Sequence, residues 1–394
     1  MGPTVARFPH SRRRLGEFVA LSPCSAAPRQ ALQPTAAACS LFQMCSSPNH
    51  RSNAALLILI LVCPLTSLGD EPQQRPDQRL LGAYYYPWYY KERWTSEPVT
   101  NTPKLGWYSS DDRTVAAEHI RWARQADLDF FLVSWLSPRG REGLNLKESV
   151  LPELEKADFR FALLYETPLA LGLPAGKPLD LATQLPDGVK AGDRFVEHFG
   201  HLAETYLKHP QYLRLGGKAV VVIYLVRDMV NAGEYLQAVR QRLGQRGVEL
   251  YLIADVVYWE SPEKLDWALL KEHFQAVTAY NMYYRPKFLE AVRTQFEAAD
   301  RAARSHGLRL VPNVMPGYDD TPLRGTERVT INRRRGQFYR DYWAVASKFV
   351  GPNQPFLLVT SFNEWHEGTE LEPSTEYGDM YLTLTRELAA GIRK

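Results

Sequence analysis

Residues 218–224 read Lys-Ala-Val-Val-Val-Ile-Tyr, an almost unbroken apolar run without alternation of polar and apolar side chains. Runs of this kind are typical of parallel strands that are buried on both faces of a sheet. Helical spacing follows over residues 233–244, and the same order of strand and helix recurs along the chain. Strict alternation of the two indicates a parallel sheet.

Seven further strand–helix units precede or follow this one along the chain. The expected strands cover residues 80–86, 128–135, 159–165, 218–224, 248–254, 276–280, 308–314 and 356–362. The expected helices cover residues 111–126, 146–157, 193–208, 233–244, 262–272, 287–306, 332–350 and 377–392. Eight strand–helix units predict an α/β fold, a (β/α)8 TIM barrel that forms one domain over residues 80–394. The competing fold is a doubly wound open sheet, but Pro87 and not a Gly-x-Gly-x-x-Gly turn follows the first strand.

Composition and charge narrow the possible functions. The 394 residues are 45% hydrophobic and 23% charged, which excludes a disordered chain. Residues 1–69 carry six arginines and one acidic residue, a net charge of +5, so with +3 in total residues 70–394 carry −2. A slightly acidic body argues against nucleic acid as a partner. All four cysteines precede residue 70, so the body has no disulfide, cysteine nucleophile or zinc–thiolate site.

The N-terminal segment has the features of an export signal. Residues 54–62 (AALLILILV) follow Arg51 and precede a small and polar run over 66–69. This order is typical of a secretory signal, and the apolar run is shorter than the roughly 20 residues that span a bilayer. We therefore expect residues 1–69 to be a leader with a signal peptide, and the mature protein to be secreted or periplasmic without a membrane span.

Three details belong to this N-terminal prediction. Signals usually begin near the first residue, so Met44 is the expected true start. Cys63 is only a weak candidate for a lipid anchor, because the bulky Val62 stands where a small residue is usual. Residues 70–79 are polar and contain proline, and we interpret them as a linker.

The C-terminal ends of the expected strands carry the candidate binding residues, since the active site of a TIM barrel lies there. Aromatic, acidic and amide side chains predominate among them: Tyr84, Tyr86, Trp88, Trp135, Glu166, Tyr224, Asp255, Tyr280, Asn281 and Asn313. Aromatic rings stack on the C–H faces of sugars, while carboxylates and amides bind their hydroxyls. These ends together indicate a carbohydrate site, although any one tyrosine can simply fill the mouth of the barrel.

The strongest signal is the segment Asn363-Glu364-Trp365-His366-Glu367-Gly368, directly after the last expected strand. Two carboxyl groups buried three residues apart can differ in pKa, so that one acts as a base and the other as an acid. Glycosidic cleavage needs such a pair. The alternative is a capping or solvated acidic cluster, because Glu370 and Glu372 follow closely.

Other candidate residues carry weaker signals. A metal on His366 and Glu367 is conceivable, but the zinc-protease spacing His-Glu-x-x-His fails because residue 370 is Glu. We therefore expect no metal and no cofactor. His119 is better interpreted as a structural residue than as a ligand, whereas Asn281 and Arg285 are candidates for substrate contacts.

Residues 360–369 (TSFNEWHEGT), followed by Leu371-Glu372-Pro373, resemble the C-terminal motif of glycoside hydrolase family 99, the endo-α-1,2-mannosidase and endo-α-1,2-mannanase family. Residues 83–89 (AYYYPWY), and residues 118–120 (EHI) leading to 133–135 (VSW), fit as well. The likeness spans about residues 80–390. It implies a (β/α)8 barrel and a retaining, metal-independent enzyme that cuts internal α-mannosidic bonds of oligosaccharides or polysaccharides, and we expect it to be a monomer.

The resemblance also implies roles for the two acids. Glu364 matches the base that deprotonates the sugar 2-hydroxyl, which then attacks C1 to form a 1,2-anhydro sugar. Glu367 matches the acid that protonates the leaving oxygen and later activates water. The expected substrate-binding residues are Tyr84, Tyr86, Trp88, Trp135, Glu166, Tyr224, Tyr280, Asn281, Asn363, Trp365 and His366.

Two departures from the family pattern indicate the broader family-99-like group. Residues 86–89 read Tyr-Pro-Trp-Tyr where a Tyr-Gly-Trp-Tyr-like variant is expected, and the loop over residues 167–192 has no obvious match. The alternative functions are a non-catalytic glycan-binding or polysaccharide-assembly barrel and a metal-dependent hydrolase. The presence of both Glu364 and Glu367 favours the hydrolase that uses two acids, because a binding protein needs neither.

Overall fold

The structure is a computed structural model, and it describes residues 79–174, 176–257, 265–282, 287–351 and 354–393. The predicted signal over 54–62, the start at Met44, the candidate anchor Cys63 and nearly all of the linker lie outside the described residues, as does Arg285. Within the described ranges, no helix is both long enough and apolar enough to cross a membrane.

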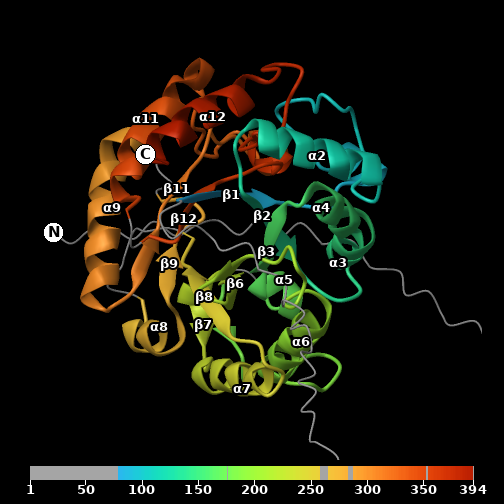
Figure 1. Cartoon of the computed structure of the whole chain (residues 1–394), viewed down its shortest axis with the longest axis vertical. Coiled ribbons are helices and arrows are strands. Elements are labelled where there is room, and N and C mark those ends of the chain that lie inside the picture. The colour runs from blue at the N-terminus through green and yellow to red at the C-terminus, as the bar shows by residue number, and fades with distance from the viewer. Residues whose placement is uncertain (1–78, 175, 258–264, 283–286, 352–353, 394) are drawn as a thin grey trace, which may run out of the picture. The chain divides into compact units, whose positions relative to one another are not determined.

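A parallel barrel forms the centre of the domain, with helices outside it (Figure 1). In sheet order the strands are β10, β9, β8, β6, β3, β2, β1, β12 and β11. Their bounds are β1 (Leu80–Tyr85), β2 (Phe130–Trp135), β3 (Arg160–Tyr165), β6 (Lys218–Ile223), β8 (Leu250–Asp255), β9 (Ala276–Thr278), β10 (Arg309–Val311), β11 (Asn313–Val314) and β12 (Phe356–Val359). The predicted α/β barrel is confirmed.

The expected seventh strand is divided in two at Pro312. β10 pairs with β9 on one side, and β11 pairs with β12 on the other. Proline has no N–H to donate to a neighbouring strand, but its carbonyl oxygen accepts a hydrogen bond from the Leu358 N–H at 3.0 Å. One chain segment thus contacts both neighbouring strands, and the parallel barrel is nearly closed.

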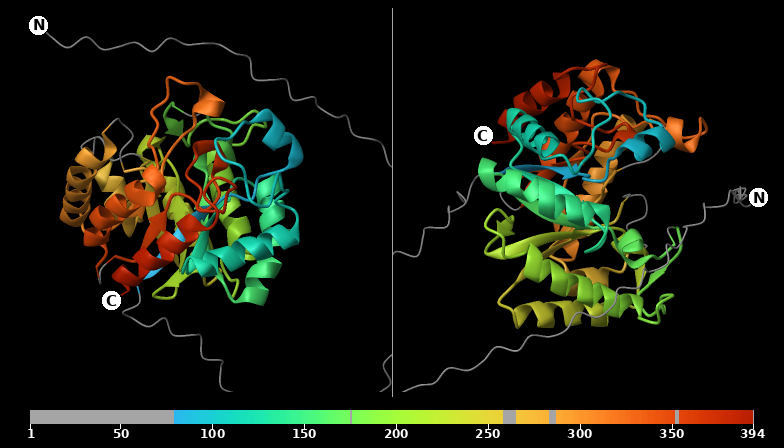
Figure 2. Two further views of the ribbon diagram at one scale, coloured as in Figure 1. Left: turned by 90° about the horizontal axis from the view of Figure 1, so that it is seen from above. Right: turned by 90° about the vertical axis from the view of Figure 1, so that its right-hand side faces the viewer.

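The helices surround the strands in all three views (Figures 1 and 2). They are α1 (Lys91–Ser96), α2 (Arg113–Gln125), α3 (Arg141–Asn145), α4 (Leu151–Ala157), α5 (Thr167–Leu171), α6 (Ala191–Thr205), α7 (Gly233–Gly244), α8 (Trp267–His273), α9 (Phe288–Ser305), α10 (Thr321–Arg324), α11 (Gln337–Ala346) and α12 (Met380–Ile392). A π-helical turn (Leu146–Val150) joins α3 to α4, so the helix expected over 146–157 is composite. Short 3₁₀ turns cover Val226–Asp228, Arg334–Gly336, Ser347–Phe349 and Trp365–Glu367.

Three short strands lie outside the barrel ring. β4 (Leu179–Asp180) pairs with β7 (Met229–Val230), and β5 (Arg214–Leu215) pairs antiparallel with β6. The loop over residues 167–192, which has no clear match to the family, therefore contains α5 and β4.

Two apolar layers follow from the alternation of side chains along each strand. On β1, Leu81 and Tyr85 pack in the layer between strands and helices, whereas Leu80 and Tyr84 pack inside the barrel. Both faces of the strand are buried. This is why the strands appear in the sequence as continuous apolar runs.

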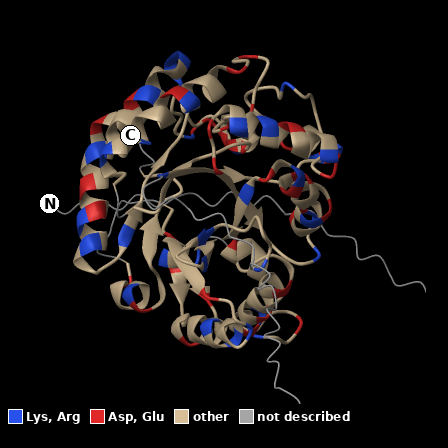
Figure 3. Cartoon of the chain, viewed as in Figure 1, with Lys and Arg blue, Asp and Glu red and all other residues tan. Residues whose placement is uncertain are grey.

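Charged residues of both signs occur along the outer helices such as α9 and α11 (Figure 3). This mixed surface agrees with the small net charge of residues 70–394.

A glycine inside the barrel makes room for a large ring on the neighbouring strand. Gly82 lies opposite Phe130 in the β1–β2 register. A Cβ atom on Gly82 would lie 2.2 Å from Phe130 Cζ, and the Phe130 ring packs edge-on against Phe356 at 5.0 Å. At this level of the barrel interior, the small Gly82 on β1 thus makes room for the large Phe130 on β2.

We predict that Gly82→Ala destabilises the protein by about 1–3 kcal/mol, because the added methyl group overpacks the barrel interior. Urea unfolding curves of the purified protein measure the change. Adding Phe130→Leu to Gly82→Ala should recover part of the loss. Gly244→Ala is the matched control, since a Cβ there meets no atom within 4 Å. Equal stability of the Gly82 variant and the wild type would contradict this account of the packing.

Candidate active site

The segment that follows β12 is held against the end of β1. The Phe362 N–H donates to the Tyr84 carbonyl at 2.8 Å. The Asn363 side chain continues this pairing: its Oδ1 accepts from the Tyr86 N–H at 2.8 Å, and its Nδ2 donates to the Tyr86 carbonyl at 3.0 Å. Both polar ends of the Asn363 amide are therefore used within the chain. It holds the loop, although we expected it to bind substrate.

Tyr89 holds the same segment from its other side. Its hydroxyl donates to the Asn363 carbonyl at 2.8 Å and accepts from the Trp365 N–H at 3.0 Å. The Glu364 N–H donates to Ser361 Oγ at 2.7 Å. The backbone on either side of Glu364 is thereby hydrogen-bonded to buried partners. These bonds fix the backbone from which the Glu364 side chain extends.

Glu367 lies in a pocket of polar side chains. Its Oε2 accepts a hydrogen bond from Tyr280 OH at 2.8 Å. Its Oε1 lies 3.3 Å from Arg324 Nη1 and 3.5 Å from Tyr318 OH. Burial, followed by the nearby Glu364 carboxylate, raises the pKa of Glu367, and Arg324 and Tyr280 only partly oppose this. A raised pKa favours the protonated form, which is the form that a general acid needs.

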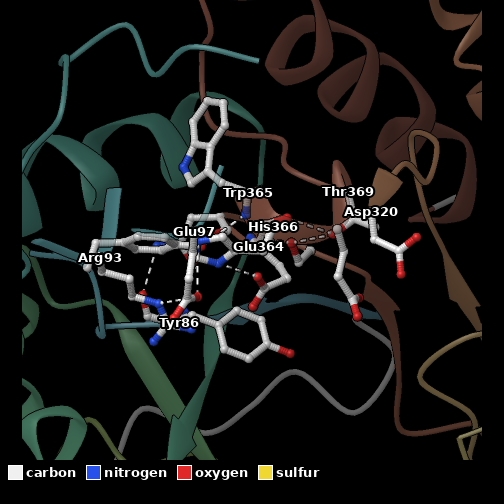
Figure 4. A network of polar contacts seen from close by, with 12 residues as sticks. Tyr86, Arg93, Glu97, Asp320, Glu364, Trp365, His366 and Thr369 are labelled. Carbon is white, nitrogen blue, oxygen red and sulfur yellow. Dashed lines mark hydrogen bonds and ion pairs between the residues drawn. The ribbon is translucent and has the colours of Figure 1, made fainter. Parts of the chain in front are cut away.

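Glu364 has a different environment. Its side chain is buried, and its Oε1 lies 3.3 Å from His366 Nδ1. The close-up shows Glu364 and Tyr86 on the same side of the loop, while the Trp365 ring points away from them (Figure 4). The two acids of the motif are thus near neighbours with unlike partners, a hydroxyl and a guanidinium for Glu367 and an imidazole for Glu364.

Further acids line the inside of the barrel. Asp255 accepts hydrogen bonds from Tyr84 OH at 2.9 Å and from the Val257 and Tyr280 N–H groups. Burial raises the pKa of Asp255 to about 6. Glu166 Oε1 accepts from Ser134 Oγ at 2.9 Å, and burial raises the pKa of Glu166 to about 8.

Aromatic rings complete this cluster. The Tyr86 and Trp88 rings are 4.5 Å apart, tilted by 30°. The Tyr280 ring stands edge-on to Tyr84 at 5.0 Å and to Tyr224 at 6.3 Å. The structure therefore brings together eight of the expected residues, namely Tyr84, Tyr86, Trp88, Glu166, Tyr224, Tyr280, Glu364 and Glu367. Flat rings beside carboxyl groups form a surface that suits a sugar.

Two expected binding residues lie elsewhere. Trp135 is fully buried in the layer between strands and helices, where it stacks on Tyr165 at 5.8 Å and contacts His198 edge-on at 5.2 Å. Alternation along β2 turns its side chain away from the barrel interior. Trp365 is also fully buried and donates through Nε1 to Glu372 Oε2 at 2.9 Å. Neither ring faces the carboxyl cluster, so the expectation that they bind substrate is not supported.

Two further side chains have buried positions. His119, which we interpreted as structural, bridges Tyr85 OH at 3.1 Å and Glu372 Oε1 at 3.1 Å. Asn281 is buried, and its N–H donates to the Val257 carbonyl at 3.0 Å. Among the residues that the structure describes, no three His, Cys, Asp or Glu side chains gather as a metal site.

The segment after β11 carries residues that contact Glu367 and that were not predicted from the sequence. Asp320 is fully buried and accepts hydrogen bonds from Tyr318 OH at 3.0 Å, Arg324 Nη1 at 2.9 Å and Arg328 Nε at 3.1 Å. Arg324 thus lies between Asp320 and Glu367. The available signal was the long, charged connection over residues 315–331, because long loops at the mouth of a barrel often carry functional residues.

This fold and site define a class: a glycosidase-like TIM barrel with two unlike carboxyl groups and aromatic rings at the C-terminal ends of its strands. The chain belongs to the family described as "Glycosyltransferase WbsX", which matches residues 96–385 and is related to glycoside hydrolase family 99. The resemblance of residues 360–373 to glycoside hydrolase family 99 is thereby confirmed.

Similar proteins agree with this placement. The chain is 26% identical over 313 residues to the "glycoprotein endo-alpha-1,2-mannosidase-like protein" of Mus musculus, covering 73% of this chain and 64% of that protein. It is 24% identical over 321 residues to the "glycoprotein endo-alpha-1,2-mannosidase" of Mus musculus, covering 74% and 63%. The chain therefore spans less than two thirds of the length of these curated relatives.

The fold is similar to that of a solved structure, the family 99 endo-alpha-mannosidase from Bacteroides thetaiotaomicron. The TM-score is 0.62 at 23% identity, and the match covers 80% of this chain and 97% of that one. This likeness supports the fold of the described barrel.

We predict that the stability difference between Glu166→Gln and the wild type depends on pH. Because the pKa of Glu166 rises from 4.5 to about 8 on folding, the folded protein binds more protons than the unfolded chain between these values. Wild-type stability therefore falls as pH rises through this window. Glu166→Gln should be more stable than the wild type by ~2–5 kcal/mol at pH 9, at about 1.4 kcal/mol per pKa unit, and by much less at pH 5.

Urea unfolding at the two pH values measures this difference. Glu148→Gln, at an exposed position, is the matched control for the chemical change. A difference between Glu166→Gln and the wild type that stays constant from pH 5 to pH 9 would show that Glu166 is not held protonated by burial.

Proposed function

We propose that this protein is an exported, retaining endo-glycosidase that hydrolyses internal α-mannosidic bonds of an oligosaccharide or polysaccharide. The observation that carries the proposal is the pair Glu364 and Glu367 at the end of β12, in unlike environments beside aromatic rings. Membership of a family related to glycoside hydrolase family 99 supports the reaction class. The names of the similar mouse proteins support the α-1,2-mannoside type of linkage.

In the first step Glu364 takes the proton from the sugar 2-hydroxyl, and O2 attacks C1 as the bond from C1 to the leaving oxygen breaks. Glu367 gives its proton to that leaving oxygen. In the second step Glu367, now a carboxylate, takes a proton from water. The water oxygen adds to C1, the bond from C1 to O2 breaks, and Glu364 returns its proton to O2. Two inversions at C1 leave the configuration retained, without an enzyme nucleophile, unlike the usual two-carboxylate scheme.

The stereochemistry of this route restricts the substrate. O2 can displace the leaving group only from the opposite face of C1, which requires the two groups to be trans. In an α-mannoside both are axial and trans, whereas in an α-glucoside the 2-hydroxyl is cis to the leaving group. The mechanism therefore favours α-mannosides over α-glucosides, and a 2-deoxy analogue has no nucleophile at all.

A second candidate function is transfer of the sugar to another carbohydrate. The description of the matching family as a glycosyltransferase favours it. The same intermediate serves both outcomes, because an acceptor hydroxyl can replace water in the second step. Product analysis with and without added acceptor sugars separates the two: a new, longer product indicates transfer, whereas shortened chains alone indicate hydrolysis.

We predict that Glu364→Gln and Glu367→Gln each lower the hydrolysis of an α-mannan by about 10²–10⁴-fold, the usual contribution of an acid or base. An α-mannosyl fluoride separates the two roles, because a fluoride leaving group needs little protonation. Glu367→Gln should recover part of its first-step rate on the fluoride, whereas Glu364→Gln should not, because O2 still needs its base.

Circular dichroism of both variants controls for folding. Full activity of either variant on the α-mannan would reject the catalytic role of that acid, whereas a wild-type protein that binds but does not cleave α-mannan would leave the glycan-binding alternative ahead. Equal recovery of both variants on the fluoride would reject this division of roles.

We predict that Arg324→Gln moves the basic limb of the pH–rate profile upward by about one pH unit. The Arg324 charge lowers the pKa of Glu367, so its removal keeps the acid protonated to higher pH. Steady-state kcat/KM against pH measures the limb. Arg328→Gln is the matched control, because it removes a contact to Asp320 while the contact between Arg324 and Glu367 remains. A basic limb that moves down, or moves equally in both variants, would contradict this role for Arg324.

A further inference from the structure

Resting on the proposed function, we infer that Glu97 and His366 form with Glu364 a carboxylate–imidazole–carboxylate array that positions the catalytic base. Glu97 follows α1, far from the motif in sequence, and His366 lies two residues after the base. Figure 4 shows the imidazole between the two carboxyl groups, with a dashed line to each. In this array His366 is a positioning residue, not the substrate ligand that the sequence suggested.

The distances define the array. His366 Nδ1 lies 3.3 Å from Glu364 Oε1, and His366 Nε2 lies 3.4 Å from Glu97 Oε2. Within the described part of the chain, neither ring nitrogen makes a hydrogen bond of good geometry, so these two carboxyl groups are what the nitrogens face. Catalytic contacts are often long in substrate-free enzymes and shorten when substrate binds.

Packing fixes the plane of the imidazole. The His366 side chain is 3% exposed and lies nearly parallel to the Tyr89 ring at a centroid distance of 5.4 Å. Tyr89 also binds the backbone on both sides of Glu364 through its hydroxyl. The same residue therefore orients the imidazole and the loop that carries the base.

The outer carboxylate is itself held in place. Glu97 Oε2 accepts a hydrogen bond from Arg93 Nε at 3.1 Å, and the Arg93 guanidinium lies 4.4 Å from the centre of the Trp88 ring. The Glu97 side chain is 35% exposed, whereas that of Glu364 is 6% exposed. The array thus leads from a buried acid to one in contact with solvent.

The chemistry explains why an imidazole is used. Among side chains, histidine alone presents one nitrogen at each edge of a rigid ring, so a protonated ring can donate to two carboxylates at once. The nearby acid Glu367 is bound by Tyr280 and Arg324, whereas the Glu364 carboxyl group contacts His366. An imidazole ring held by Glu97 at one edge contacts Glu364 with its other edge and so keeps Glu364 directed at the sugar, as outer carboxylates orient histidine ligands at metal centres.

The test uses Glu97→Gln, which removes the outer charge without touching either catalytic acid. We expect kcat on α-mannan to fall about 10–100-fold with KM within about threefold, as for other supporting residues. The deficit should persist on α-mannosyl fluoride, because it acts through the base and not through the acid. Glu92→Gln, an exposed acid on the same helix, is the matched control and should retain wild-type kcat.

A double-mutant cycle separates an array from two independent effects. His366→Asn should lower kcat at least as much as Glu97→Gln, and the double variant should be no worse than His366→Asn alone. Additive losses, wild-type kcat in Glu97→Gln, or recovery of Glu97→Gln on the fluoride would each overturn the inference.

A readout without substrate separates this inference from the proposed function. In ¹⁵N NMR of histidine-labelled protein, the His366 ring nitrogens should shift in both Glu97→Gln and Glu364→Gln and remain unchanged in Glu92→Gln. If the wild-type protein cleaves no mannoside but these shifts appear, the array stands and the proposed reaction fails. If neither substitution moves the His366 signals, the array itself is wrong.

Discussion

The pairing of Asn363 with the backbone of Tyr86 is the contact on which the candidate site depends. It extends the β1–β12 ladder beyond the point where β12 ends, with a side-chain amide in place of a peptide group. Such a buried amide is costly unless both of its ends are hydrogen-bonded, and here both are. Because this clamp and the Tyr89 hydroxyl flank Glu364, the residue that we propose as the base is held by the same hydrogen bonds that join the first and last strands of the barrel.

The charge of each acid at the mouth of the barrel depends on the partner that the fold places beside it. Several acids are buried within one region, and burial alone favours their neutral forms. The structure gives each acid a different partner: Ser134 for Glu166, Tyr84 for Asp255, Tyr280 and Arg324 for Glu367, and His366 for Glu364. Unlike partners are how one fold separates an acid from a base, and this arrangement underlies the roles that we propose.

The family context is compatible with two outcomes of the reaction that we propose, hydrolysis and transfer of the sugar. The matching family is described as a glycosyltransferase, whereas the similar mouse proteins are named for endo-mannosidase activity. A 1,2-anhydro sugar can be opened by water or by another sugar hydroxyl, so both descriptions are compatible with the same two acids. In the mechanism that we propose, the choice of acceptor depends on the groups that bind the incoming molecule, not on Glu364 and Glu367.

Much of the fold could be predicted because it depends on local sequence pattern. Apolar runs such as residues 218–224 marked the strands, and the motif over residues 363–368 marked the two acids, since strand ends meet at one rim of a barrel. The division of the seventh strand at Pro312 was not predicted, because it depends on which neighbour each half pairs with.

Tertiary structure alone decided which side chains face the site. Strands that are apolar on both faces carry no signal of which face lines the barrel, so Trp135 was expected at the mouth but packs beneath the helices. Arg324 reaches Glu367, and Glu97 reaches His366 beside Glu364, from segments that are distant in the sequence, and no local pattern encodes such a contact. The sequence by itself determined the main strands and helices and the motif with its two acids, whereas the partners that distinguish one acid from the other exist only once the chain has folded and buried them together.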